Sequence, residues 1–214
     1  MNFDITVLTS NWQQFALGLT QTLFVCLVAI PCGFALGTAL TLGALLGGGA
    51  LQWVARAYVE VVRNVPFVLQ VLLLYFALPA IGIRMGAQSA GITALVCYTA
   101  AYSSEILRGA LAAIPTGQTE AASALGLSEV QSFRYVLTPQ MRRYILPATG
   151  NLTITLVKES AVLSVISVRE LTYVSQDIIG RTFASVEVFA ALALLYWALT
   201  AILSAAFASA ERLQ

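Results

Sequence analysis

Ionisable residues are scarce in this sequence, and two of them stand side by side inside an apolar stretch. Lys158, the single lysine, is followed by Glu159, with Thr155 and Ser160 nearby. Each charge costs about 2.5–3.5 kcal/mol to place near the centre of a bilayer, so ionisable residues there usually face a cavity or a partner. One interpretation is that these four residues line a pathway for a polar solute. The alternative is a structural pair that locks this helix to its neighbours.

Other kinds of chemistry find no support in the residue types. The sequence has no His, and its three cysteines, Cys26, Cys32 and Cys97, lie in apolar runs without metal-ligand spacing. A P-loop needs a lysine after a glycine-rich turn, whereas Lys158 follows Val157. We therefore predict no catalytic residue, no metal site and no cofactor bound by this chain.

The composition indicates an integral membrane protein. Of the 214 residues, 59% are hydrophobic and 10% are charged, and the mean hydropathy is +0.84. The net charge of +1, with arginines scattered along the chain, gives no indication of nucleic-acid binding. The first ten residues contain Asp4 and no basic residue, so we expect no cleaved signal peptide and a first span that stays in the protein.

Apolar runs long enough to cross a bilayer define the expected elements. A helix needs about 20 such residues for a hydrocarbon core roughly 30 Å thick. We predict an all-α protein with one domain, residues 1–214, and five transmembrane helices. The expected spans are about 18–45, 59–80, 88–111, 144–168 and 186–208. Pro31 is expected to kink the first span, and Gly33 with Gly37 has the spacing that lets helices approach closely.

The distribution of arginine predicts the orientation. One side of the membrane would hold Arg56, Arg63, Arg108, Arg134, Arg142, Arg143 and Arg212, and the other side Arg84, Arg169 and Arg181. The positive-inside rule then favours an external N-terminus, a cytoplasmic C-terminus and a cytoplasmic connection between the third and fourth spans.

That connection, residues 113–143, is much longer than a simple turn requires. Pro115 and Gly117 are expected to end the third helix, and Glu120 to Leu125 to form a short helix with Ala121 and Ala122 on neighbouring positions. Gly126 suits a left-handed helix end.

A second short helix is expected directly after this one. Ser128 with Gln131 has the form of a capping box that opens it, and Thr138-Pro139 is expected to close it.

The small residues of the connection favour a docking surface, because alanines let a partner approach and Glu120 offers one charge that fixes orientation. The alternative is a helix resting on lipid headgroups, which usually carries a Lys/Arg-rich face and bulky apolar anchors. Neither is found here.

The connection resembles the EAA loop of permease subunits of bacterial ATP-binding-cassette importers. That pattern is Glu-Ala-Ala, three residues, Gly, nine residues and Ile-x-Leu-Pro. The sequence has Glu120-Ala121-Ala122, Gly126 and then Val136-Leu137-Thr138-Pro139 at the same spacing, with Thr138 in place of Leu. The resemblance implies that Glu120, Ala121, Ala122, Leu125 and Gly126 couple the chain to an ATPase.

The flanking sequence is similar to the polar amino acid branch of these importers, over roughly residues 57–179. The segments that carry the likeness are Arg63-Asn64-Val65-Pro66 with Gln70, Tyr102 to Gly109, Ile114 to Gln118, and Leu146-Pro147 with Asn151. On this basis Gln70 is counted with the pathway residues. An acid at the position of Glu159 recurs in permeases for different substrates, so it does not identify a cationic solute.

Two further features have structural interpretations. Glu105 and Arg108 stand three residues apart and are expected to form a helical ion pair. The stretch from Arg169 to Val186 is expected to be an external loop, either a docking surface for a binding protein or a solvated connection.

The resemblance implies a permease, not itself an enzyme, in the bacterial inner membrane. Its expected partners are a second permease, identical or homologous, two ATPase subunits that hold ATP and Mg²⁺, an external solute-binding protein and membrane lipid. The alternatives are an ion-coupled secondary transporter in which Glu159 carries a proton, and a non-transporting assembly or sensor subunit.

Overall fold

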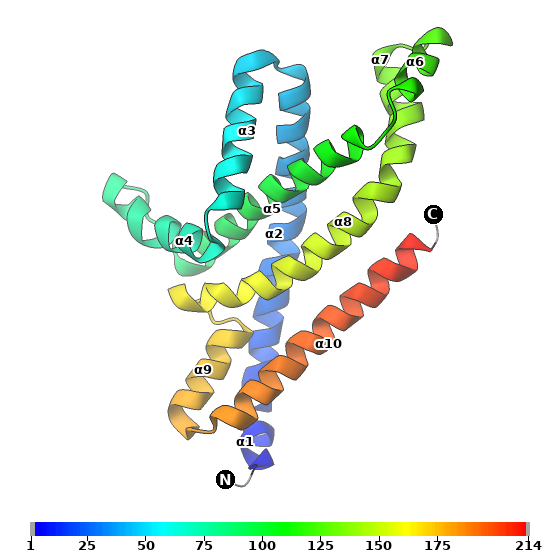
Figure 1. Cartoon of the computed structure of the whole chain (residues 1–214). Helices are drawn as coiled ribbons and strands as arrows, with labels where there is room; N and C mark the ends of the chain where they lie inside the picture. Colours follow the sequence, from blue (N-terminus) through cyan, green and yellow to red (C-terminus); the bar gives the residue numbers. More distant parts are fainter. Residues whose placement is uncertain (1–2, 213–214) are drawn as a thin grey trace.

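The regular structure of residues 3–212, the part that this computed structural model describes, is entirely helical (Figure 1). The α-helices are α1 (Ile5–Ser10), α2 (Trp12–Leu46), α3 (Gly48–Asn64), α4 (Phe67–Leu72), α5 (Ala87–Ala112), α6 (Gly117–Ala124), α7 (Glu129–Ser132), α8 (Thr138–Glu159), α9 (Leu171–Thr182) and α10 (Ser185–Glu211). Two π-helical turns, η1 (Leu73–Ala77) and η3 (Phe133–Leu137), and two 3₁₀ segments, η2 (Leu78–Ile81) and η4 (Ser160–Ile166), complete the chain.

The centre of the fold is a close contact between α2 and α5, made possible by two glycines. A Cβ atom at Gly37 would lie 2.6 Å from the carbonyl oxygen of Ala100, and one at Gly33 would lie 3.0 Å from that of Val96. The first of these distances would force the backbones apart, and a Cβ at Gly33 would also overlap the Cβ of Thr99. The predicted role of this glycine pair is confirmed, and α2 continues as one helix through Pro31.

The prediction of one helix over 59–80 is wrong, because Pro66 breaks it. Val65 is extended, with φ −91° and ψ 129°, and the chain bends by 109° between α3 and the segment Phe67–Ile81. Proline disfavours a helical conformation in the residue before it and supplies no amide donor. Helix α3 therefore returns beside α2, and α4 leaves in a new direction (Figure 1).

Pro139, in contrast, does not end a helix, so that prediction is also wrong. The chain remains helical from Glu129 to Ile166, because the π-helical turn η3 accommodates the missing amide donor of Pro139. The Thr138 hydroxyl donates to the carbonyl of Phe133 at 2.8 Å and supports this turn.

The predicted external loop, 169–186, contains the helix α9, which turns by 49° from the helix before it. Its N-cap is Glu170, a fully buried carboxylate. The carboxylate accepts hydrogen bonds from the backbone amides of Thr172 and Tyr173, both at 2.8 Å, and from the Tyr196 hydroxyl of α10 at 3.0 Å. One buried acid thus fixes α9 against α10.

The number of membrane spans depends on how the bent helices are counted. By length and hydropathy, α2 and α10 can each cross a membrane, and the two bent pairs, α3 with Phe67–Ile81 and Glu129–Ile166 with α9, raise the number to as many as four. Helix α5, with 26 residues, is long enough to cross a membrane, but its mean hydropathy is too low for it to count as a span. Five spans therefore remain a prediction.

The glycine contact predicts a strong asymmetry between two substitutions. Gly37→Ala should lower the free energy of unfolding by about 1–3 kcal/mol, because the added methyl group forces α2 and α5 apart. The matched control is Gly109→Ala on α5, where a Cβ meets no atom within 4 Å and the helix gains propensity. Thermal unfolding of the detergent-purified protein measures both. Equal midpoints in the two variants would contradict the proposed close contact.

Candidate functional site

The sequence from Glu120 to Gly126 forms part of a helix-turn-helix, here called the tip and defined as residues 117–132. Helix α6 begins at Gly117, earlier than expected, and ends in a Schellman turn. In this turn the Gly126 amide donates to Ser123 at 2.9 Å and the Leu127 amide to Ala122 at 3.1 Å. Gly126 has φ +76°, which confirms the predicted left-handed conformation.

The second helix of the tip opens with the predicted capping box. The backbone amide of Gln131 donates to Ser128 Oγ at 3.3 Å, and the backbone amide of Ser128 donates to the side-chain oxygen Gln131 Oε1 at 2.9 Å. The turn between the two helices is therefore fixed on both sides by local hydrogen bonds.

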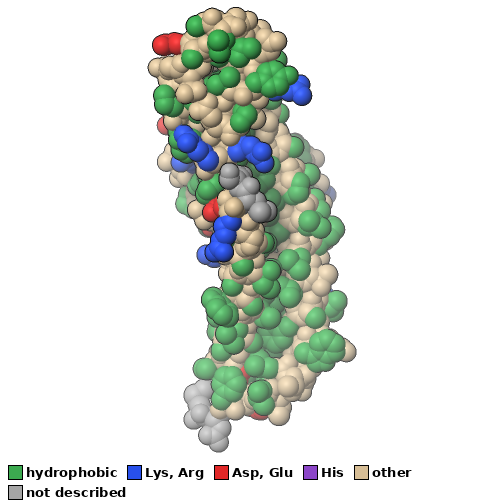
Figure 2. All heavy atoms as spheres, turned by 90° about the vertical axis from the view of Figure 1, so that its right-hand side faces the viewer, with side chains coloured by type: hydrophobic (Ala, Val, Ile, Leu, Met, Phe, Trp, Pro, Cys, Tyr) green, Lys and Arg blue, Asp and Glu red, His purple; other side chains and the backbone are tan. Residues whose placement is uncertain are grey.

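The surface of the tip combines two exposed acids, Glu120 and Glu129, with exposed apolar side chains. Glu120 and Ala121 are exposed, whereas Ala122 is buried. Leu125 is 81% exposed and Val130 is 76% exposed. Figure 2 shows hydrophobic side chains on this end of the molecule, with Lys and Arg side chains gathered just below it. Such a surface is suited to contact with another protein.

A small core beside the tip joins the two helices that carry it. Ala110 and Ile114, at the end of α5, pack with Leu137 and Met141. A hydrogen bond of 3.0 Å from Gln140 Nε2 to Gln118 Oε1 adds a polar link between α8 and α6. The tip therefore has a firm connection to both α5 and α8.

Charged side chains line an open groove of about 720 Å³ between the α2–α3 hairpin and α5, here called the charged groove. Its ionisable residues are Arg56, Glu60, Arg63, Glu105 and Arg108.

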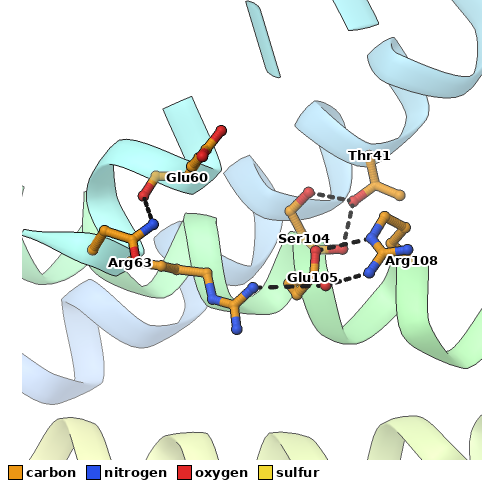
Figure 3. Close-up of polar contacts among 7 residues, drawn as sticks. Thr41, Glu60, Arg63, Ser104, Glu105 and Arg108 are labelled. Atoms are coloured by element: carbon orange, nitrogen blue, oxygen red, sulfur yellow. Dashed lines mark hydrogen bonds and ion pairs between the residues drawn. The ribbon is translucent and has the colours of Figure 1, made fainter. Parts of the chain in front are cut away.

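The expected pair of Glu105 and Arg108 is present in this groove. Arg108 Nε donates to Glu105 Oε2 at 2.9 Å, and Nη2 donates to the other carboxylate oxygen. Arg63 Nη1 lies 3.6 Å from Glu105 Oε1. Figure 3 shows the two arginines approaching Glu105 from opposite sides.

A second cleft, of about 390 Å³, adjoins this groove and is here called the Glu159 cleft. Glu159 of α8 lines it together with Arg63 and Asn64 of α3 and Tyr98 and Tyr102 of α5. Three helices far apart in the sequence thus converge on one polar opening.

The other expected pathway residues lie in different surroundings. Lys158 and Thr155 are exposed, and the Thr155 hydroxyl donates to the Asn151 carbonyl at 2.9 Å. Ser160 is buried and donates to the Val157 carbonyl at 2.7 Å.

Gln70 lies at the helix break between α3 and α4. Its Nε2 donates at 2.8 Å to the carbonyls of Val62 and Val65, two of the acceptors that the break leaves without helical partners.

Sequence reasoning missed three residues of the Glu159 cleft. The sequence indicates Arg63 only as part of a resembling motif and as one of the arginines that predict the orientation. The signals that could have found them are an arginine beside a Pro break and two tyrosines four residues apart, Tyr98 and Tyr102, on one helix face. Within residues 3–212, no group of three His, Cys, Asp or Glu residues is placed to hold a metal ion.

Apolar helices long enough to cross a membrane, a projecting tip and a polar cleft among the helices define a membrane-embedded transport permease. Residues 30–213 match the family model described as binding-protein-dependent transport system inner membrane component. The chain belongs to this family.

Relatives of similar length support the assignment. The chain is 34% identical to the glutamine transport system permease protein GlnP of Escherichia coli (strain K12), covering 99% of this chain and 98% of GlnP. It is 32% identical to the probable glutamine ABC transporter permease protein GlnM of Bacillus subtilis (strain 168), covering 94% of this chain and 93% of GlnM.

Solved structures share the fold. A chain from the crystal structure of an amino acid ABC transporter with histidines aligns with a TM-score of 0.95 and 34% identity, covering all of both chains. A chain of the inward-facing MetNI methionine ABC transporter aligns with a TM-score of 0.80 and 23% identity, covering 95% of this chain and 97% of that one. The fold is that of an ABC importer permease.

The hydrogen bonds of Gln70 lead to a test of its role. Gln70→Ala and Gln70→Glu both remove the amide donor, so each should lower the free energy of unfolding by about 1–3 kcal/mol. Thermal unfolding in detergent measures this, with the exposed Gln88→Ala on α5 as control. If both Gln70 variants keep full stability and lose only solute uptake, Gln70 acts in the pathway and its capping role is refuted.

Proposed function

We propose that this chain is the membrane-spanning permease of an ATP-driven importer for polar amino acids, and that it pairs with a second permease, identical or homologous. Two ATPase subunits hold ATP and Mg²⁺ and dock on the tips, and an external solute-binding protein delivers the solute. The observation that carries this proposal is the tip itself. The tip is exposed, and local hydrogen bonds fix its two helices, so it can bind a partner without first changing its conformation.

The shape and anchoring of the tip support its role as the coupling element. Glu120 offers one charge to orient a partner, and Leu125 and Val130 offer apolar area whose burial would stabilise the contact. Because the tip is fastened to α5 and α8, a partner that moves the tip also moves these two helices. ATP binding and hydrolysis by the ATPases would in this way alternate the access of the pathway between the two sides.

The basic side chains favour a cytoplasmic position for the tip. Arg134, Arg142 and Arg143 are exposed on the helix just below it. Arg169 and Arg181 lie near the opposite end of the fold, on and beside α9. By the positive-inside rule, this imbalance supports an external N-terminus and a cytoplasmic C-terminus.

The relatives suggest the solute, and the Glu159 cleft supplies matching chemistry. Two similar proteins carry names that refer to glutamine, so L-glutamine is the first solute to test. A cleft with one acid, one arginine and two tyrosines suits a small zwitterion.

Reconstitution of the complete complex tests the proposal. Vesicles that contain the permease, the ATPase and internal ATP, with binding protein outside, should accumulate one or more amino acids from a panel. Uptake that needs an ion gradient and no ATP would support the ion-coupled transporter instead. Absence of any uptake by the active ATPase complex would support a sensor or assembly role.

The left-handed turn at Gly126 predicts a coupling defect. Gly126→Val should cost about 1–2 kcal/mol in backbone strain and displace the second helix of the tip. In the same vesicles, we expect ATP hydrolysis without uptake, or loss of the ATPase subunit on purification. The control is Gly180→Val in α9, at an exposed helical position where a Cβ meets no atom within 4 Å. Normal uptake by the Gly126 variant would disprove coupling through this turn.

The position of Glu159 predicts a transport defect without loss of assembly. Glu159→Gln keeps the size of the side chain and removes its charge, so uptake should fall by about tenfold or more if the carboxylate holds a charged solute group. Co-purification with the ATPase should be unchanged. Thr155→Val is the control, because Thr155 is exposed and hydrogen-bonded to its own helix. Unchanged uptake by Glu159→Gln would remove this residue from the pathway.

A further inference from the structure

Arg63 is the charged residue that the two openings share. It lines both the charged groove and the Glu159 cleft, as do its neighbour Asn64 and, on α5, Tyr102. It lies in the last turn of α3, directly before the break at Val65. The two openings therefore adjoin at the last turn of α3, where Arg63 lies.

The two arginines that contact Glu105 hold it unequally. Arg108 makes two charge-assisted hydrogen bonds to the carboxylate from the same helix. Arg63 approaches one oxygen across the gap between α3 and α5, at 3.6 Å, and its side chain is 42% exposed. If Arg63 moved away, Glu105 would keep Arg108 as its counter-ion, so the usual cost of an unpaired charge would not arise.

Aromatic rings of α5 and α4 pack beside Arg63. Its guanidinium lies 5.4 Å from the centre of the Tyr102 ring, within the range of a cation–π contact. Tyr102 stacks on Tyr98 with ring centres 4.4 Å apart, and Tyr98 meets Phe67 of α4 edge-on at 5.1 Å. A cation–π contact uses none of the guanidinium N–H donors, so these remain available for hydrogen bonds.

The planar edge of a guanidinium matches a carboxylate with two parallel hydrogen bonds. We propose that Arg63 is a carboxylate relay: it exchanges Glu105 for the α-carboxylate of the transported amino acid as the solute moves between the Glu159 cleft and the charged groove. This inference rests on the proposed amino acid transport. Glu159, on α8, carries the charge that complements the α-ammonium group.

Equilibrium binding to the purified permease–ATPase complex, without binding protein, tests the relay. The probe is radiolabelled L-glutamine, and the competitors are unlabelled L-glutamine and 4-aminobutanamide, the same molecule without its α-carboxylate. In the wild type, the amine should compete at least about tenfold more weakly than the acid, since it lacks the charged acceptor.

In Arg63→Gln, L-glutamine should bind about tenfold more weakly, and the two competitors should become equivalent. Arg63→Lys should restore part of the preference, because it restores the charge but not the planar edge. Arg142→Gln, which removes an exposed arginine from α8, should leave the preference unchanged. Basal ATP hydrolysis and co-purification establish that each variant assembles.

Two results would overturn the relay. The first is an Arg63→Gln complex that still prefers the acid to the amine, and the second is a wild-type complex that does not distinguish them or binds no L-glutamine. Neither result bears on ATP-driven uptake, which the vesicle assay measures separately with the binding protein present. The relay and the proposed function can therefore fail independently.

Discussion

The close contact of α2 with α5 at Gly33 and Gly37 is the constraint on which the other features depend. Helix α5 carries one wall of both openings and ends at the tip, so its position decides where all three lie. Small residues on the facing side, Ala100 and Ser103, complete the contact. In a lipid environment, where apolar burial gives little drive for association, such close packing is the principal attraction available between helices.

The helix break at Pro66 places polar backbone groups and the Arg63 side chain at a defined position beside α5. Without it, α3 would continue as an apolar helix and the last-turn arginine would have no opening to face. The break leaves carbonyl groups without helical donors, and Gln70 satisfies two of them with one amide nitrogen. The same break directs α4 towards Tyr98, where Phe67 meets the ring edge-on. Backbone irregularity and functional chemistry therefore occur together, as in other membrane proteins that bind polar solutes.

Local sequence patterns predict the structure correctly where it depends on a few neighbouring residues. Gly126 and the capping box of Ser128 with Gln131 form as expected, because their hydrogen bonds close within one turn. The two prolines of the short motifs behave in opposite ways, and this could not be read from the sequence. Pro66 breaks a helix, whereas Pro139 is accommodated by the π-helical turn η3.

The surroundings of Glu170 and of the Glu159 cleft residues also could not be predicted from local sequence, because their partners lie far away in the chain. Glu170 was expected in an external loop, but Tyr196, 26 residues later, supplies the partner that permits its complete burial. Glu159 stands out as an acid within an apolar stretch, but nothing in its segment indicates that Arg63 and Tyr102 are its neighbours. They become a site only because three helices converge, and no periodicity within one segment encodes that convergence.

Two helices, α5 and α8, connect the tip to the Glu159 cleft. Helix α5 presents Tyr98, Tyr102, Glu105 and Arg108 along one face before it reaches the tip, and α8 leads from the tip to Glu159. At 1.5 Å per residue, the 22 residues of α8 extend about 33 Å, so a small tilt at one end becomes a displacement of several ångströms at the other. Because the core of Ala110, Ile114, Leu137 and Met141 joins both helices beside the tip, a displacement of the tip is transmitted to both helices that line the cleft. The geometry thus joins a surface suited to a protein partner and a cleft suited to a polar solute through the same two rigid elements.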